Sequence, residues 1–192
     1  MEAVLLALVV FLLLQSTVRN FKVDGSSMFP TLEAGNYLLV NRLVYLQLDT
    51  ARLSRVTPFW KVTDTNPRFA LHAPRRSEVV VFEFPLDPTK DFVKRVVGVP
   101  GDIVELRDGN VLIDGVLIPE PYVEHKGNSN DGPLLLGLGE YYVLGDNRRS
   151  SNDSRSWGPV PEKNILGKVW VVYWPSSGIQ TLNTLNNILG FP

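Results

Sequence analysis

One candidate nucleophile near the start of the chain is a serine held between a glycine and a proline. Residues 23–32 read VDGSSMFPTL. Pro30 restricts Phe29 to extended conformations, and Gly25 permits a close backbone approach that a side chain would block. Such a segment can hold a serine hydroxyl on a rigid turn, although an ordinary turn serine fits the same pattern.

A lysine in a strand-forming segment could supply the general base that such a serine needs. Residues 91–102 read DFVKRVVGVPGD, and period-two alternation places Phe92, Lys94 and Val96 on one face. An ordinary lysine, with a pKa of about 10.4, is almost entirely protonated near neutral pH. An apolar wall disfavours the charged amine and lowers its pKa, so that the neutral amine can accept a proton. The competing interpretation is a strand lysine that extends to solvent beside Arg95.

A dense polar segment follows later in the chain, between two predicted strands. Residues 145–158 read GDNRRSSNDSRSWG. Short polar and charged side chains at this density are typical either of a solvated loop or of a hydrogen-bonded support for a site. Composition alone leaves both interpretations open.

Together, these segments resemble the bacterial type I signal peptidases in order and spacing. The nucleophile motif of that family, Ser-Met-x-Pro-Thr-Leu, matches residues 27–32, and its lysine motif, Lys-Arg-x-Val-Gly-x-Pro-Gly-Asp, matches residues 94–102. The late motif, Gly-Asp-Asn-Arg followed by Ser and Asp-Ser-Arg, matches residues 145–155. A fourth motif, which ends in Val-Val-Val-Phe-Glu-Phe-Pro, matches residues 76–85.

The resemblance implies that Ser27 is the nucleophile and Lys94 its general base. Ser151 aligns with a family serine that orients the lysine, and Asp153 and Arg155 align with a pair that supports the same loop. The residues expected to line shallow apolar pockets for small substrate side chains are Phe21, Val23, Met28, Leu32, Val81, Phe92 and Val93.

One position departs from the pattern of many Gram-negative members of the family. Gly25 stands where those members carry a serine whose hydroxyl helps to hold the oxyanion, whereas Gram-positive-type members carry glycine there. The resemblance therefore leaves the backbone N–H of Ser27 as the expected oxyanion donor.

The elements that must position these side chains are predicted to be mostly β-strands. Two Asp-Gly pairs, at residues 108–109 and 114–115, favour the positive φ angles of two-residue hairpin turns. Residues 50–74 and 125–139 have the composition of long loops. The runs rich in valine and tyrosine that predict strands are Tyr37–Leu43, Val79–Phe84, Phe92–Val97, Ile103–Leu106, Val111–Ile113, Tyr141–Leu144 and Val169–Trp174.

By the resemblance, the fold class is mostly β, with a coiled antiparallel β-sheet core of the signal peptidase type and an N-terminal membrane-anchor helix. The apolar run from Ala3 to Leu14 sits where the family carries this anchor, but it is shorter than the roughly 20 residues of a full span. A cleaved signal peptide and a buried core helix are alternatives, and the lack of a basic residue before the run disfavours the former.

The expected domain organisation follows from these features. Residues 1–18 are predicted to be a transmembrane anchor, either truncated at its start or spanning with a strained fit. Residues 19–192 are predicted to form an extracytoplasmic catalytic domain, in which residues 103–140 are a small inserted β-hairpin excursion.

Composition restricts the partners and cofactors. The chain has 192 residues, a formal net charge of -1 and no cysteine, which excludes disulfides, thiolate metal sites and a cysteine nucleophile. His72 and His125 lack metal-ligand spacing, so neither a metal nor another cofactor is expected. The charge balance gives no basic surface for nucleic acid.

The predicted function is that of a single-pass serine endopeptidase of the bacterial plasma membrane, with its catalytic domain on the extracytoplasmic face. Its partners would be the lipid bilayer and preproteins whose signal peptides carry small residues before the cut. A self-cleaving or maturation peptidase with the same Ser-Lys core is an alternative, although no DNA-binding domain of the repressor type is visible. A non-catalytic, membrane-tethered β module that binds exported chains is a second alternative.

Overall fold

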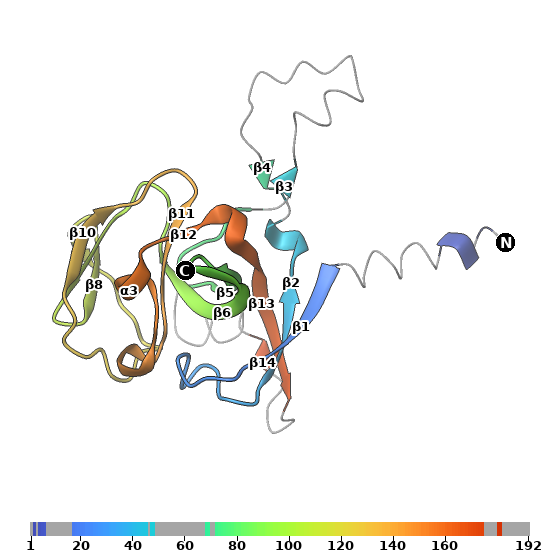
Figure 1. Cartoon of the computed structure of the whole chain (residues 1–192), viewed down its shortest axis with the longest axis horizontal. Helices are drawn as coiled ribbons and strands as arrows, with labels where there is room; N and C mark the ends of the chain where they lie inside the picture. The colour runs from blue at the N-terminus through green and yellow to red at the C-terminus, as the bar shows by residue number, and fades with distance from the viewer. Residues whose placement is uncertain are drawn as a thin grey trace, which may run out of the picture.

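A computed structural model describes residues 2, 4–6, 17–45, 47–48, 68–69, 72–174 and 180–181. The described chain is built mostly from antiparallel strands with a few short helical turns (Figure 1). This architecture confirms the predicted mostly β fold class. Each of the predicted strand runs falls on a strand of the structure.

The main sheet has eight strands in the order β1-β2-β13-β5-β6-β11-β12, with β14 beside β13. Its neighbouring strands are antiparallel. The bounds of these strands are β1 Val18–Lys22, β2 Tyr37–Asn41, β5 Val79–Phe84, β6 Asp87–Gly98, β11 Glu140–Leu144, β12 Val160–Pro161, β13 Ile165–Trp174 and β14 Gln180–Thr181.

Strand β5 lies in the middle of this sheet and is buried on both faces. Val79 and Val81 pack into one apolar cluster, while Val80 and Phe82 pack into another. Because successive strand residues point to opposite faces, a continuous run of valines is what a strand covered on both sides requires. The packed strand gives β6, its neighbour, a rigid partner.

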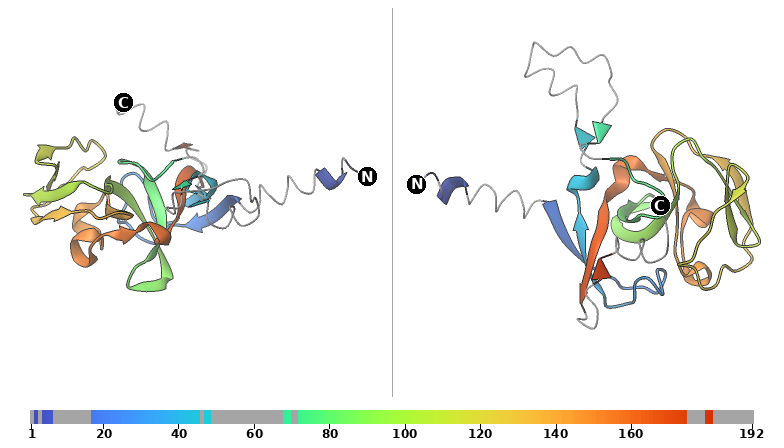
Figure 2. Two further views of the ribbon diagram at one scale, coloured as in Figure 1. Left: turned by 90° about the horizontal axis from the view of Figure 1, so that it is seen from above. Right: turned by 180° about the vertical axis from the view of Figure 1, so that it is seen from behind.

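A second, four-stranded sheet in the order β10-β7-β8-β9 is formed by the chain between β6 and β11. It lies at the opposite side of the molecule from β1 (Figures 1 and 2). Its strands are β7 Ile103–Arg107, β8 Asn110–Ile113, β9 Val116–Leu117 and β10 Asp131–Leu135.

Both predicted hairpin turns of this small sheet are confirmed. Asp108 and Gly109 have φ angles of 48° and 75°, and Arg107 pairs with Asn110 across the turn. The turn at residues 114–115 has φ angles of 52° and 79°. These positive φ angles are the ones that Asp-Gly pairs adopt at low cost.

The remaining described elements are short. A two-stranded sheet pairs β3 Gln47–Leu48 with β4 Arg68–Phe69. The helical turns are η1 Leu43–Tyr45, η2 Arg148–Ser150, α3 Ser154–Trp157 and η3 Glu162–Asn164.

Two features of the sequence prediction are wrong in detail. Residues 125–139, predicted to be a loop, contain strand β10, which pairs with β7 despite Gly132 and Pro133. Both residues weaken a strand signal in the sequence, and the pairing includes a register shift that accommodates them. Val18, assigned to the predicted anchor, is the first residue of β1 and pairs with Asn41.

Other predictions fall outside the described residues. Most of the predicted anchor, residues 1–18, is not described, nor is most of the predicted loop at residues 50–74. Within the described residues, no helix has the length and apolar character needed to cross a membrane.

We expect Gly109→Ala to destabilise the fold more than Gly115→Ala. Both glycines have left-handed φ angles, which cost an alanine roughly 1–2 kcal/mol. A Cβ on Gly109 would also lie 2.4 Å from the carbonyl oxygen of Lys126, whereas no described atom lies within 4 Å of a Cβ on Gly115. The clash should add about 1–3 kcal/mol.

Urea unfolding of the two variants measures this difference. Equal losses of the free energy of unfolding would contradict the expected clash at the β7–β8 turn.

Candidate active site

Ser27 and Lys94, predicted from separate segments, meet in the structure. Ser27 lies in the turn between β1 and β2, and Lys94 lies in β6. The Nζ atom of Lys94 is 2.8 Å from the Oγ atom of Ser27 and 2.9 Å from the carbonyl oxygen of Val93. This distance is short enough for direct proton transfer between the hydroxyl and a neutral amine.

The surroundings of Lys94 favour its neutral form. Its side chain is almost completely buried, and the residue is 4% exposed. The Nζ atom lies 5.3 Å from the ring centroid of Phe92, the residue that alternation places on the same face. Burial lowers the pKa of the Lys94 amine to about 8, and the negative charges of Asp153 and Asp146 oppose part of this shift.

The turn that carries Ser27 is fixed by apolar anchors on its C-terminal side. Met28 and Leu32 are fully buried in the cluster beneath the turn. The N–H of Leu32 donates to the carbonyl oxygen of Met28 at 2.8 Å, and the N–H of Phe29 donates to that of Ser26 at 3.1 Å. Ser27 therefore stands at the edge of a packed segment rather than in a free loop.

The late motif packs directly against this turn. The backbone N–H of Asn147 donates to the carbonyl oxygen of Ser27 at 3.0 Å, and its side-chain amide donates to that of Ser26 at 3.1 Å. A Cβ on Gly145 would lie 2.4 Å from the same Ser27 oxygen and 2.2 Å from Ser151 Oγ. Glycine at position 145 is thus a condition for the close approach of the two segments.

Ser151, predicted to orient the lysine, lies beside this glycine. Its hydroxyl oxygen is buried and makes no hydrogen bond with the described residues. The hydrogen bonds of the Lys94 amine go instead to Ser27 and Val93. The orienting role of Ser151 stays a prediction.

Asp153 and Arg155 form the pair that the family resemblance implies. Arg155 donates to the two carboxylate oxygens of Asp153 at 2.7 and 2.8 Å. Asp153 is fully buried, begins helix α3 as its N-cap, and accepts a hydrogen bond from the N–H of Gly145 at 3.1 Å. The pair therefore links the short helix to the glycine that contacts Ser27.

A second buried ion pair, which the sequence prediction left out of the site, joins all three motifs. Arg95 donates to both carboxylate oxygens of Asp146, at 2.8 and 2.6 Å, and to the carbonyl oxygen of Ser77 at 2.7 Å. Thr31 Oγ1 donates to the same carboxylate at 2.5 Å. The signal available in the sequence was that Arg95 and Thr31 belong to the two motifs that carry Lys94 and Ser27.

Most of the predicted pocket residues share one apolar cluster, and Phe92 does not. Phe92 packs against another cluster. Its ring also stacks on that of Phe84, with the ring centroids 4.7 Å apart. The cluster beneath the serine turn contains Val23, Met28, Leu32 and Val81 as buried members, with Phe21 and Val93 partly exposed against it. Their role in substrate binding stays a prediction.

The described residues contain no group of three or more histidine, aspartate or glutamate side chains placed to hold a metal ion.

Comparison of the sequence with known protein families identifies the family of this chain. The model of the family described as signal peptidase, peptidase S26, matches residues 1–174. The chain belongs to the signal peptidase family S26. Together with its relatives, this membership makes the chain a type I signal peptidase, a hydrolase, and confirms the resemblance drawn from the motifs.

Several similar proteins are described as signal peptidase I. Signal peptidase I of Bacillus caldolyticus is 35% identical over 81% of this chain and 79% of its own. Signal peptidase I of Pseudomonas fluorescens is 30% identical over 94% of this chain and 74% of its own. A crystal structure of a signal peptidase I from Enterococcus faecalis V583 is 31% identical and covers 52% of this chain and 98% of its own, with a TM-score of 0.45.

We expect Gly145→Ala to reduce signal peptide cleavage by this signal peptidase about a hundredfold or more, because displacing a reacting group by about 1 Å has that cost. The added methyl group would clash with Ser27 and Ser151. Gly25→Ala is the matched control, since no described atom lies within 4 Å of a Cβ there. The kcat/KM of both variants, measured with their melting temperatures, tests this, and a folded Gly145→Ala enzyme with full activity would contradict it.

Proposed function

We propose that the chain is a membrane-anchored serine endopeptidase that removes signal peptides from exported preproteins, with Ser27 as nucleophile and Lys94 as general base. The observation that carries these roles is the 2.8 Å contact between Lys94 Nζ and Ser27 Oγ in a buried site. Membership of the signal peptidase family indicates that the reaction is cleavage of a signal peptide. The contact between Ser27 and Lys94 provides a nucleophile and a base that can perform it.

In the proposed mechanism, the neutral amine of Lys94 takes the proton from the hydroxyl of Ser27. The Ser27 oxygen attacks the scissile carbonyl carbon, and the backbone N–H of Ser27 stabilises the oxyanion, since Gly25 provides no hydroxyl. The ammonium of Lys94 then gives its proton to the leaving amine nitrogen, which breaks the peptide bond. The same lysine, again neutral, next takes a proton from a water molecule whose oxygen attacks the acyl carbon. Its ammonium returns that proton to Ser27 Oγ as the ester bond breaks, which frees the product with a new carboxyl group and regenerates the enzyme.

An uncovered edge of β6 supports an extended mode of substrate binding. Strand β11 pairs with β6 from Arg95 to Gly98, so within the described chain no strand covers that edge from Asp87 to Lys94. A peptide in an extended conformation can add to such an edge through main-chain hydrogen bonds. This placement would bring its scissile carbonyl near Ser27.

The apolar cluster beneath the serine turn supports a preference for small substrate side chains. Its members are buried against one another beneath the turn, and the proposed pockets would be shallow depressions above them. Such depressions would accept alanine-sized side chains at the first and third positions before the cut, as signal peptides supply. The proposed lining residues in this cluster are Phe21, Val23, Met28, Leu32, Val81 and Val93. Phe92, proposed with them, packs against the neighbouring cluster.

The late motif is proposed to hold the base in place. Ser151 would orient the Lys94 amine through its buried hydroxyl, which makes no hydrogen bond within the described chain and so is available for this contact. Asp153 and Arg155 would support the same loop through their ion pair.

The N-terminal apolar run is proposed to anchor the enzyme in the bacterial plasma membrane. The apolar run from Ala3 to Leu14 would lie in the bilayer, and the chain from Val18 onward would form the catalytic domain on the extracytoplasmic face, where exported preproteins emerge. The support is the unbroken apolar composition from Ala3 to Leu14 and its place just before the serine motif.

Ser27→Ala should abolish cleavage of a signal-peptide-bearing substrate, while Ser26→Ala should retain most of it. The Ser26 side chain is exposed, and its contacts with Phe29 and Asn147 use the backbone carbonyl oxygen, which alanine keeps. Loss of the nucleophile should cost at least about a thousandfold in kcat. Gel-based cleavage of a preprotein by both folded variants measures this, and an inactive Ser26→Ala enzyme beside an active Ser27→Ala enzyme would reverse the assignment.

The rate of cleavage should rise with pH through a group with a pKa of about 8, because burial lowers the pKa of the Lys94 amine to that value. The neutral amine is the base, so the ammonium that dominates at lower pH is inactive, and kcat/KM should fall about tenfold per pH unit below the pKa. Lys94→Arg should be inactive at every pH, since a guanidinium does not deprotonate. A pH-independent rate with unchanged folding and substrate binding would eliminate the lysine-base mechanism.

A further inference from the structure

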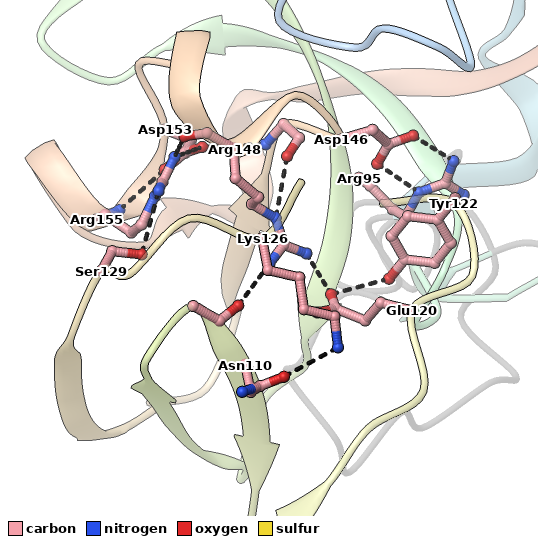
Figure 3. Close-up of polar contacts among 12 residues, drawn as sticks. Arg95, Asn110, Glu120, Tyr122, Lys126, Ser129, Asp146, Arg148, Asp153 and Arg155 are labelled. Carbon is pink, nitrogen blue, oxygen red and sulfur yellow. Dashed lines mark hydrogen bonds and ion pairs between the residues drawn. The ribbon is translucent and has the colours of Figure 1, made fainter. Parts of the chain in front are cut away.

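A buried carboxylate outside the family motifs connects the small sheet to the catalytic loop. Glu120 follows strand β9, and its side chain is 0% exposed. It forms an ion pair with Arg148, whose side chain is 1% exposed (Figure 3). Two charges removed from water in this way are stable only as a pair, so each holds the other in place.

The first connection from Glu120 runs through Arg148. The Nε atom of Arg148 donates to the carbonyl oxygen of Gly145 at 3.1 Å, and its Nη1 atom donates to that of Gly109 at 3.4 Å. The guanidinium therefore bridges a turn of the small sheet and the glycine that lies against Ser27.

The second connection runs through Tyr122. Its hydroxyl donates to Glu120 Oε1 at 3.2 Å, and burial raises the pKa of this hydroxyl, which keeps it protonated as a donor. The centroid of the Tyr122 ring lies 4.0 Å from the Cζ atom of Arg95. The guanidinium of Arg95 in turn donates two hydrogen bonds to Asp146 (Figure 3). This stacking contact fixes the plane of the Arg95 guanidinium.

Both connections end at the same short segment, residues 145–147. One reaches the carbonyl of Gly145 and the other the carboxylate of Asp146, and the next residue, Asn147, donates its N–H to the carbonyl oxygen of Ser27. Arg95 is also the chain neighbour of Lys94. A displacement of Glu120 would therefore be transmitted to both sides of the Ser27–Lys94 pair.

We propose that Glu120 is a positioning residue for cleavage: through Arg148 and Tyr122 it fixes the backbone of residues 145–147, and so the distance between Ser27 and Lys94. This inference rests on the proposed roles of Ser27 and Lys94. It gives the small sheet a part in catalysis, although its strands contribute no group that touches the reacting atoms.

Glu120→Gln tests the proposal with little change of shape. The amide oxygen can still accept hydrogen bonds, but the charge of Arg148 is left buried without a counter-charge, and its hold on Gly145 weakens. We expect kcat to fall about tenfold or more. KM should change less than about twofold, because Glu120 does not touch the substrate. Glu105→Gln is the matched control, since its partner Arg107 lies exposed on the same small sheet.

A double variant separates positioning from general stability. Glu120→Met combined with Arg148→Met removes both buried charges, so the melting temperature should recover relative to Glu120→Gln. The carbonyl of Gly145 still lacks its donor in this variant, and kcat should stay low.

Each outcome decides the proposal. Low kcat in the double variant at a recovered melting temperature supports it. A kcat that recovers together with the melting temperature overturns it, as does a Glu120→Gln enzyme as active as Glu105→Gln. If Ser27→Ala is inactive in the same assay, these failures leave the proposed function intact; if Ser27→Ala is active, both proposals are overturned.

Discussion

Burial of a lysine amine beside a serine hydroxyl is the interaction on which the rest of the structure depends. An amine in water keeps its proton near neutral pH, whereas the Lys94 amine, removed from water beside Phe92, has a pKa of about 8. Removing it from water costs free energy that the fold must offset elsewhere. The doubly covered strand β5 and the apolar anchors of the serine turn supply that packing next to the site.

The polar part of the site holds the two partners at a fixed distance. Thr31, Arg95 and Asp146 come from the three separate motifs and meet in one buried cluster, so each motif is held by the other two. The charges of Arg95 and Asp146 are paired within this cluster. The nearby Asp153 is paired in the same manner with Arg155.

The sequence predicts the parts of this arrangement that depend on local pattern. The valine-rich runs, the Asp-Gly turns, and the Ser27 and Lys94 segments carry signals within a few residues of themselves. Strand β10 lacks such a signal because Gly132 and Pro133 disfavour it, and only pairing with β7 makes it a strand. Glu120 stands between two prolines and resembles an exposed loop residue; its burial against Arg148 is set by tertiary packing alone.

The path of the chain around the small sheet bears on how the family can diversify. The chain leaves the main sheet at the end of β6 and returns to it at β11, where Gly98 of β6 lies opposite Tyr142 of β11. The segment between β6 and β11, including the small sheet, is topologically one long connection between two neighbouring antiparallel strands. The entropic cost of closing such a connection rises only slowly with its length. Insertions and deletions there leave the catalytic sheet in register. Glu120 is the exception, because its removal would leave the guanidinium of Arg148 buried without a counter-charge.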